Sequence, residues 1–172
     1  ALKIPIKHIV RGIRAVTRVE GRFNVLFTGK CGVIIDFAHT DDGLKNVLTT
    51  VREFAPGRII TVFGCGGNRD RTKRPVMGRI VTELSDFAVI TSDNPRFEEP
   101  MDIIADIKKG IAADNYEVEP DRRRAIMRAL DLAGKDDIVL IAGKGAEKYQ
   151  EIRGVKYEYN DEAFVLSLGD GK

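Results

Sequence analysis

Short apolar runs recur along the chain, rich in β-branched residues and without alternating polar positions. The runs are Val33–Ile35, Ile59–Phe63, Phe87–Ile90 and Ile138–Ala142. Strands that helices cover on both faces of a parallel sheet have this composition, because neither face meets water. The runs therefore predict the central strands of a mostly parallel sheet.

Helical patterns lie between these runs, with apolar residues at spacings of three and four positions. They follow Thr40, Pro75, Pro100 and Pro120. Thr40 is predicted to be an N-cap, and the three prolines fall where a first helical turn accepts them. Because strands and helices alternate, we predict an α/β fold: an open, mostly parallel, Rossmann-like sheet flanked by helices.

The two ends of the chain depart from this alternation. Residues 1–22 carry one short amphipathic stretch and a polar connector, which predict a short helix within an interdomain linker; residues 23–172 are predicted to form the domain. Further elements are expected near the ends: an N-terminal hairpin or edge strand of residues 23–27 paired with 33–37, a late edge strand over 153–159, and a short last helix over 161–168.

The balance of charges argues against a nucleic-acid-binding module. The chain has 172 residues with 28 basic and 26 acidic side chains, and a net charge of +2. Affinity for nucleic acid rests on clustered Lys and Arg that neutralise phosphates. The one basic run, Arg122–Arg124, fits a solvated face at a helix start. We therefore expect no nucleic-acid partner.

The cysteine and histidine content excludes other classes of site. Cys31 and Cys65 are too few for a disulfide framework, and with only His8 and His39 beside them they do not make a metal cluster. We expect no metal site in this chain. No apolar run approaches 18 residues and no signal-peptide pattern is present, so we expect a cytoplasmic protein without a membrane partner.

Polar, glycine-rich loops follow the predicted strands, at residues 36–43, 64–74, 91–96 and 142–150. In an open parallel sheet, ligands bind outside the carboxyl ends of the strands, which all lie at one edge. Much of the chain's glycine, asparagine, aspartate, arginine and lysine falls in these loops. The sequence therefore predicts a ligand site built from them.

Each loop also has a simpler interpretation. The glycines and basic residues of 64–74 suit an anion, or they form a connector with a solvated basic face. Glu147 is able to accept a hydrogen bond from a ligand ammonium, or it is an exposed glutamate at a helix start. Asp36 suits ribose hydroxyls, and His39 is equally a turn histidine. Asn94-Pro95-Arg96 has the composition of an ordinary tight turn.

Taken in order, the loop motifs carry a resemblance. The succession GRF, DFAHT-x-DGL, VFGCGGNRDRTKRPVMG, SDNPR-x-EEP and VLIAGKG-x-E-x-YQ resembles the C-terminal domain of the Mur ligases, specifically the diaminopimelate-adding UDP-N-acetylmuramoyl-tripeptide synthetases. The resemblance runs from about Val19 to the end of the chain. It implies an ATP-dependent amide ligase that adds a third amino acid, meso-diaminopimelate, to UDP-MurNAc-L-Ala-D-Glu through an acyl phosphate in peptidoglycan synthesis.

The resemblance also implies cofactors and partners. ATP and Mg²⁺ are bound mainly by a central domain, which together with an N-terminal domain belongs to the same chain in that family. The sequence given lacks both domains, so we expect an excised domain that is inactive alone, holds no catalytic residue, and belongs to a monomeric enzyme.

Roles for single residues follow from the motif positions. By resemblance, the nucleotide is contacted by Arg22, Asp36 and His39, and the amino-acid substrate by Arg69, Asn94, Arg96, Gly143 and Glu147. A guanidinium clamps a carboxylate through two parallel hydrogen bonds, and a carboxylate accepts from an ammonium, so the assigned residues suit the zwitterionic far end of diaminopimelate.

The chain departs from the family pattern at several positions. Asn24 stands where the family has glutamate, Phe37 where it has tyrosine, Asp41 where it has a helix-starting proline, and Ala146 where it has histidine. The change at Ala146 leaves the identity of the third amino acid open. The alternatives are a divergent Mur-ligase-like paralogue, a non-catalytic amino-acid- or nucleotide-binding module, and a generic nucleotide-binding α/β domain.

Overall fold

The computed structural model describes residues 4–16 and 19–169. Within them, six strands form one sheet in the order β1-β2-β6-β3-β4-β5, and only the β1–β2 pair is antiparallel. The strands are β1 (Asn24–Phe27), β2 (Gly32–Asp36), β3 (Ile59–Phe63), β4 (Phe87–Ile90), β5 (Tyr116–Val118) and β6 (Ile138–Ala142). The predicted fold class and the hairpin with residues 23–27 are confirmed.

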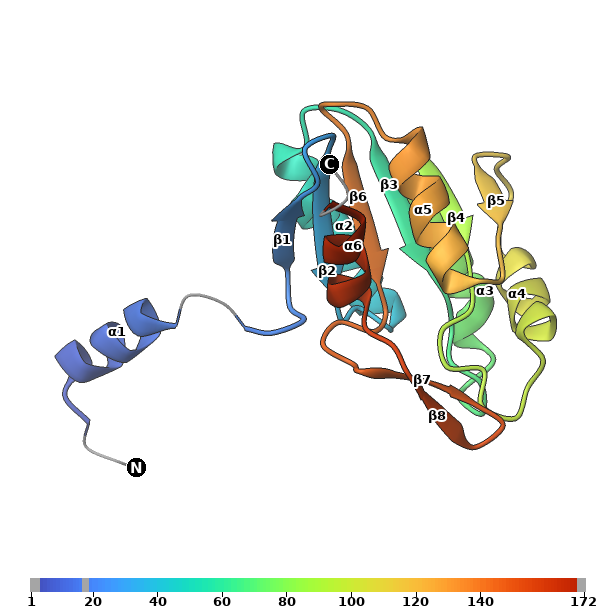
Figure 1. The fold of residues 1–172 in the computed structure, drawn as a ribbon, viewed down its shortest axis with the longest axis horizontal. Coiled ribbons are helices and arrows are strands. Elements are labelled where there is room, and N and C mark those ends of the chain that lie inside the picture. The colour runs from blue at the N-terminus through green and yellow to red at the C-terminus, as the bar shows by residue number, and fades with distance from the viewer. Residues whose placement is uncertain (1–3, 17–18, 170–172) are drawn as a thin grey trace.

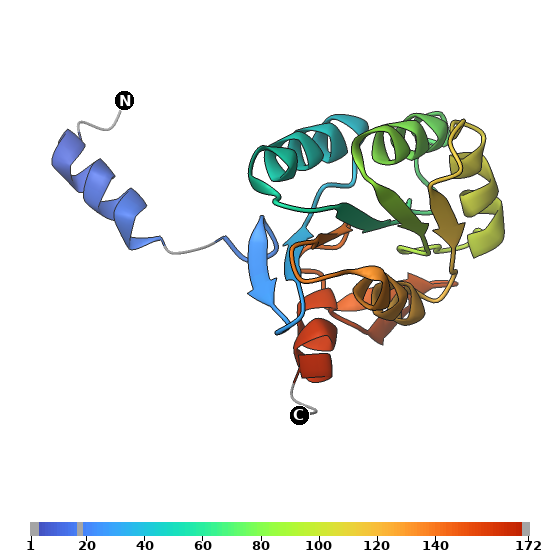
Figure 2. The ribbon, with the colours of Figure 1, turned by 90° about the horizontal axis from the view of Figure 1, so that it is seen from above.

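Helices cover both faces of this sheet (Figures 1 and 2). One face carries α2 (Asp41–Phe54), α3 (Lys73–Leu84) and α4 (Pro100–Lys108), and the other carries α5 (Arg122–Leu132) and α6 (Asp161–Gly169). Because helices cover both faces of the central strands, nearly every position along these strands is apolar, and apolar and polar residues do not alternate. The predicted last helix is confirmed as α6.

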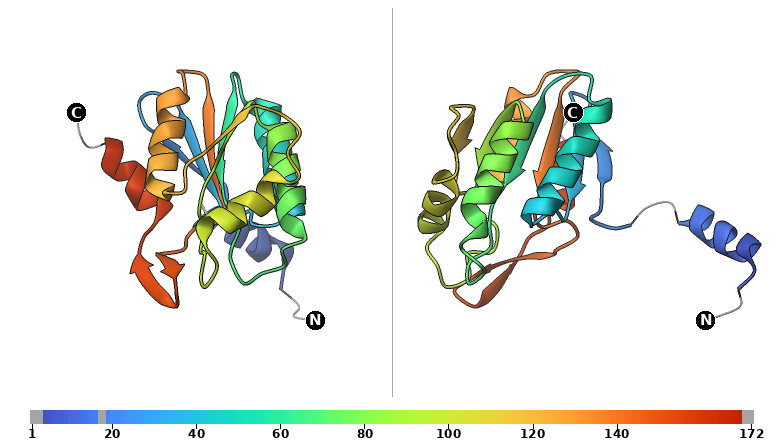
Figure 3. Two further views of the ribbon diagram at one scale, coloured as in Figure 1. Left: turned by 90° about the vertical axis from the view of Figure 1, so that its right-hand side faces the viewer. Right: turned by 180° about the vertical axis from the view of Figure 1, so that it is seen from behind.

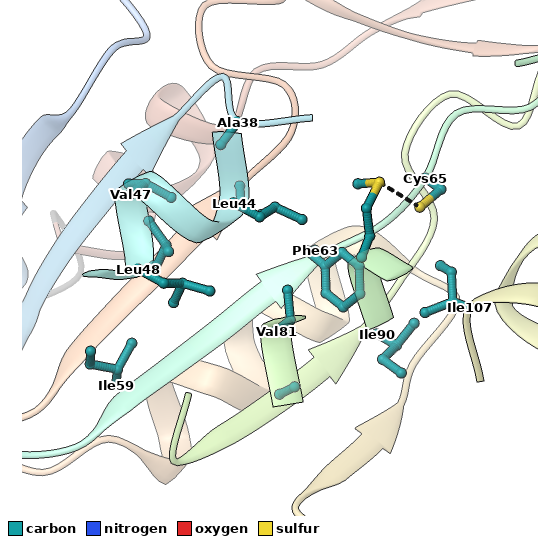
Figure 4. Close-up of a cluster of buried hydrophobic side chains, with 14 of the residues drawn as sticks. Ala38, Leu44, Val47, Leu48, Ile59, Phe63, Cys65, Val81, Ile90 and Ile107 are labelled. Atoms are coloured by element: carbon teal, nitrogen blue, oxygen red, sulfur yellow. Dashed lines mark hydrogen bonds between the residues drawn. The ribbon is translucent and has the colours of Figure 1, made fainter. Parts of the chain in front are cut away.

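Two apolar clusters, one on each face, hold the layers together. Residues of α2, α3 and α4 such as Leu44, Val81 and Ile107 pack on one face of the strands, as Figure 4 shows. Ala129 of α5 and Val165 of α6 pack on the other face. Burial of an aliphatic side chain contributes roughly 1.5–3 kcal/mol. The clusters therefore fix the strand ends from which the loops emerge.

The start of α2 shows how local chemistry places a helix. The Thr40 side chain accepts a hydrogen bond from the Gly43 N–H at 3.1 Å, as predicted for an N-cap. Pro75 and Pro100 lie in the first turns of α3 and α4, as expected. The prediction is wrong for Pro120, which precedes Asp121, the residue that caps α5 by accepting from the Arg123 and Arg124 N–H groups.

The end of the chain differs from the prediction. The segment expected as an edge strand over 153–159 is β8 (Val155–Glu158), and it pairs antiparallel with β7 (Tyr149–Ile152) in a separate two-stranded sheet. This hairpin extends beyond the carboxyl ends of the main strands (Figures 1 and 3). Neither β5 nor β7 was predicted, because each is short and half-buried, without an apolar run.

The N-terminal stretch forms α1 (Ile6–Ala15), and none of its residues is buried. Figure 1 draws α1 apart from the sheet. Within the described residues no helix has the length and apolar character that crossing a membrane requires.

Candidate functional site

Loops from the carboxyl ends of β2, β3, β4 and β6 line a pocket of about 450 Å³. Register explains the convergence, because Asp36 pairs with Ala142 and Phe63 with Ile90, so the parallel strands end at one edge. Most of the predicted site residues line this pocket: His39, Arg69, Asn94, Arg96, Gly143 and Glu147. Arg22 and Asp36 are not among the lining residues.

The glycine-rich loop after β3 packs directly onto the Asn94-Pro95-Arg96 turn. The Gly67 N–H donates to the Asn94 carbonyl oxygen at 2.9 Å, and a Cβ on Gly67 would collide with the Pro95 carbonyl oxygen. A Cβ on Gly64 would collide in the same way with the carbonyl oxygen of Thr91. These glycines therefore permit a close approach of two backbones, which a side chain would prevent.

Arg96 is held in an unusual conformation. Its φ is 53°, a left-handed value that is rare for a residue with a side chain. The β7–β8 hairpin holds its backbone: the Arg96 N–H donates to the Glu151 carbonyl oxygen at 3.0 Å, and the Arg153 N–H donates to the Arg96 carbonyl. The Arg96 side chain donates from Nη1 to the Gly67 carbonyl oxygen at 2.7 Å, and its Nε lies 3.4 Å from Glu151 Oε2.

Asn94 and Glu147 form one hydrogen-bonded group with a third residue that the sequence did not single out, Lys144. Asn94 Nδ2 donates to Glu147 Oε2 at 2.8 Å, and Lys144 Nζ donates to the same oxygen at 2.8 Å. Burial of Glu147 opposes its ionisation, but the hydrogen bonds from Lys144 and Asn94 outweigh that effect and lower the pKa of its carboxyl. Glu147 is therefore a carboxylate at neutral pH, and it is not at a helix start.

A second carboxylate that the sequence did not single out, Asp93, lies beside these residues. Asp93 is buried and lines the pocket, and its Oδ1 accepts from the Asn94 N–H at 2.6 Å. Gly143 has a φ of +115°, and a Cβ there would lie 2.8 Å from Asp93 Oδ2. Glycine at 143 thus leaves room for this carboxylate at the pocket wall.

The residues assigned to the nucleotide gather around Phe37. The Arg22 guanidinium lies 4.7 Å from the centre of the Phe37 ring, and the His39 ring lies edge-on to it at 4.5 Å. His39 Nδ1 is also 2.8 Å from the Phe37 carbonyl oxygen. The Asp36 carboxylate accepts from two backbone N–H groups, those of Phe23 at 2.7 Å and Ala38 at 2.8 Å.

Arg69 differs from the other predicted residues. It is exposed at the pocket rim, and its side chain makes no hydrogen bond to another described residue. Neighbouring Arg74 is buried instead: it donates to both oxygens of Glu98, to Asp106 and to the Gly66 carbonyl oxygen. The basic residues of this loop are therefore not one solvated face, because Arg74 braces the loop from inside.

The basic run Arg122–Arg124 was also interpreted as a solvated face, and for Arg122 that is wrong. Arg122 is buried and donates to both oxygens of buried Asp161, at 2.9 and 2.8 Å. It also donates to the Ala142 carbonyl oxygen at the end of β6. Arg123 and Arg124 are exposed, as expected. Lys144, Asp93, Arg74 and Arg122 carry no individual signal in the sequence, because a single charged residue is most often exposed.

Cys65 lines the pocket, but it is not suited to be a nucleophile. Burial raises the pKa of the Cys65 thiol to about 12, so it is protonated near neutral pH. Its sulfur lies 3.7 Å from that of Met77 (Figure 4). Within the described part of the chain, no group of three or more His, Cys, Asp or Glu side chains is arranged to hold a metal ion.

Comparison with known proteins settles the family. A profile described as "Mur ligase, glutamate ligase domain" matches residues 21–145. The chain belongs to this family. A Clostridium tetani protein named UDP-N-acetylmuramoyl-L-alanyl-D-glutamate--2,6-diaminopimelate ligase is 49% identical over 168 residues, 96% of this chain and 35% of the relative. An Aquifex aeolicus protein of the same name is 51% identical over 166 residues, 95% of this chain and 34% of the relative.

Solved structures agree with the fold of this Mur ligase domain. A structure of UDP-N-acetylmuramoyl-L-alanyl-D-glutamate--2,6-diaminopimelate ligase matches with a TM-score of 0.83 at 38% identity, over 97% of this chain and 35% of that one. A Mycobacterium tuberculosis folylpolyglutamate synthase with ADP has a TM-score of 0.67 at 20% identity, over 82% of this chain and 33% of that one, which supports the fold alone. The Mur ligase domain described here spans about a third of the length of these relatives.

Proposed function

We propose that this Mur ligase domain holds the incoming amino acid, meso-diaminopimelate, in an ATP-dependent ligase that extends UDP-MurNAc-L-Ala-D-Glu in peptidoglycan synthesis. The observation that carries the proposal is one pocket lined by Arg69, Asn94, Arg96, Gly143 and Glu147. These residues come from three separate loops, and the relatives of about 50% identity are named as diaminopimelate ligases. A pocket of about 450 Å³ has the size of a small-molecule site.

The pocket chemistry suits the unreacting end of meso-diaminopimelate, which carries a carboxylate and an ammonium. Nη1 of Arg96 donates one N–H to Gly67 and Nε faces Glu151, so the two N–H groups of Nη2 and the second one of Nη1 remain for a ligand carboxylate among its described contacts. Arg69, exposed at the rim, adds a second guanidinium. Glu147 and Asp93 supply carboxylate oxygens for the ammonium. Lysine lacks the second carboxylate and would leave Arg96 without that partner.

We place ATP at the same edge of the sheet, beside the Phe37 loop, whose Phe37 and His39 also line the pocket. Bound ATP supplies the phosphoryl group that converts the acceptor carboxylate into an acyl phosphate, from which the amine of the amino acid displaces phosphate. We assign Arg22 to the phosphates and His39 and Asp36 to the nucleoside. The Arg22 guanidinium and the His39 ring, both against Phe37, present cationic and planar surfaces suited to such a ligand. Mg²⁺ would be held mainly outside this chain, and we assign no residue here to it.

The rest of the proposal concerns the complete enzyme. We propose that the ATPase and acceptor-binding parts lie in other domains of the same protein, that it acts as a monomer in the cytoplasm, and that this chain alone does not turn over. The support is that the chain matches about a third of each relative. Steady-state ligation by the 172-residue chain alone would contradict the proposal that the ATPase and acceptor-binding parts lie in other domains.

Amino-acid-dependent ligation by the complete enzyme tests the proposal. Rates would be compared for meso-diaminopimelate, lysine and ornithine. We expect Arg96→Ala to lower kcat/KM for meso-diaminopimelate on the order of a hundredfold, because a charge-assisted pair with the distal carboxylate is lost. Lysine use should change little, since lysine has no such carboxylate.

The matched control is Arg79→Ala, which removes an exposed arginine of α3 away from the pocket. It should leave both substrates unaffected. Equal losses for meso-diaminopimelate and lysine in Arg96→Ala would contradict the recognition role. Binding of amino acids without any ligation by the complete enzyme would favour the alternative of a non-catalytic module.

A further inference from the structure

Lys144 is buried behind the wall of the pocket, with a side chain that is 0% exposed. Its Nζ donates to Asn94 Oδ1 at 3.0 Å and to Glu147 Oε2 at 2.8 Å. Burying an ammonium costs several kcal/mol unless it is paired and hydrogen-bonded. The two hydrogen bonds therefore stabilise the buried ammonium, and they also restrain the side chains of Asn94 and Glu147.

The contacts of Asn94 define which way its amide points. Oδ1 accepts from Lys144 and also from the Glu151 N–H at 2.9 Å, while Nδ2 donates to Glu147 Oε2 at 2.8 Å. A reversed amide would place Nδ2 against two donors, so the two arrangements differ greatly in free energy. Asn94 is thereby left to offer an N–H, and not an oxygen, to a molecule in the pocket.

Lys144 also changes the charge that a ligand meets. Glu147 Oε2 already accepts from Lys144 and Asn94, so the negative charge of Glu147 is largely compensated by the ammonium behind it. Arg96 stands on the same side of the pocket, with its own partner Glu151 at 3.4 Å. Glu147 still accepts from the ligand ammonium, but without Lys144 its uncompensated negative charge would also act on the ligand carboxylate that Arg96 binds, and would repel it.

We propose that Lys144 is a positioning residue for substrate selection. It fixes Asn94 as a hydrogen-bond donor and compensates Glu147, so that this side of the pocket, with Arg96, selects an end group bearing a carboxylate. The inference rests on the proposed function for the identity of its ligand. The arrangement of the side chains is independent of that function.

Kinetics of the complete enzyme test the selection. Lys144→Met keeps an unbranched side chain, one atom shorter, and removes the ammonium with its hydrogen bonds, and we expect the KM for meso-diaminopimelate to rise on the order of tenfold or more. The kcat and the KM for ATP should stay within about twofold of the wild type, because a positioning role acts on amino-acid binding. Lys148→Met, on the same loop but exposed, is the control and should behave as the wild type. An unchanged KM for meso-diaminopimelate, or a parallel fall in all parameters, would overturn the proposal.

NMR of the 172-residue chain tests the positioning without any activity. The side-chain NH₂ protons of Asn94 should exchange with water much more slowly than those of exposed Asn46 in the wild type. Lys144→Gln, which keeps an N–H donor, should preserve this protection better than Lys144→Met. Exchange of Asn94 at the rate of Asn46 in the wild type would refute the positioning role. A wild-type enzyme that ignores meso-diaminopimelate but shows protected Asn94 would refute the proposed function alone.

Discussion

Single residues carry the site through contacts that residue type alone does not give. Arg96 was predicted from its motif, but its left-handed φ of 53° and its bond to Gly67 depend on two other loops. Gly67 in turn is a glycine because the Pro95 carbonyl oxygen occupies the place of a Cβ. The sequence predicted one by one which of these residues line the pocket, whereas it did not predict the contacts that restrain each side chain.

Gly67→Ala should therefore disturb the turn that holds Arg96. We expect a loss of about 1–3 kcal/mol in the free energy of unfolding, because two packed backbones must move apart. Thermal melting followed by circular dichroism measures it. Gly32→Ala is the control, since its Cβ would meet only Ile138 at 3.7 Å. Equal melting temperatures for the two variants would show that the loops adapt without cost.

At the scale of elements, a buried ion pair joins α5 to α6. Arg122 and Asp161 have side chains only 1% and 0% exposed, and the Tyr159 hydroxyl donates to Asp161 at 2.8 Å. Burial opposes the charge of Arg122, but Asp161 outweighs it and raises the pKa of the guanidinium. The pair also reaches the Ala142 carbonyl, so it fastens α6 to the loop edge of the sheet.

Arg122→Met should loosen this junction strongly. Removing one partner leaves the Asp161 carboxylate buried without its cation, which costs about 3–5 kcal/mol. Urea unfolding should show the loss as a lower midpoint. Arg124→Met changes an exposed arginine two positions along the same helix, and it should change the free energy of unfolding by less than about 0.5 kcal/mol. Comparable midpoints for both variants would mean that the ion pair contributes little.

At the scale of the whole molecule, a charged network joins the site loops to the helices behind them. Glu98, after the Asn94-Pro95-Arg96 turn, accepts from both Nη atoms of Arg74 in α3 and from the Asn68 N–H in the glycine-rich loop. Arg74 also donates to Asp106 of α4. The hydrogen bonds from Arg74 lower the pKa of Glu98 from 4.5 to about 2, against the effect of burial.

This shift predicts loss of stability in acid. The pKa of Glu98 is lower in the folded protein than in the unfolded chain, so the unfolded chain binds its proton first as pH falls. The contribution of Glu98 is present above about pH 5 and is lost as pH falls from 4.5 towards 2. Urea midpoints measured from pH 7 to pH 2 should therefore separate wild type from Glu98→Gln at neutral pH and converge in acid.

The control for this series is Glu83→Gln, an exposed glutamate of α3. Its midpoints should follow the wild type at every pH. A constant difference between wild type and Glu98→Gln from pH 7 to pH 2 would contradict the linkage, since a protonated Glu98 no longer attracts Arg74 more than glutamine does.

The sequence by itself determined the layers of this protein and the edge of the sheet at which the candidate pocket lies. Doubly covered strands must be apolar throughout, and parallel strands bring their following loops together, so the apolar runs and polar loops were sufficient for both. The loop motifs in their order also indicated the Mur ligase family before the family profile confirmed it.

Only the tertiary structure decided which charges are buried and what they hold. In the sequence, nothing distinguishes three basic residues from exposed ones: Lys144, Arg74 and Arg122. In the structure each is buried and paired with a carboxylate that is 3 to 39 positions away along the chain. The short strand β7, which fastens Arg96, gave no apolar signal. Pairings over such separations depend on the whole folded chain, because burial of a charge is tolerated only where a partner is already in place.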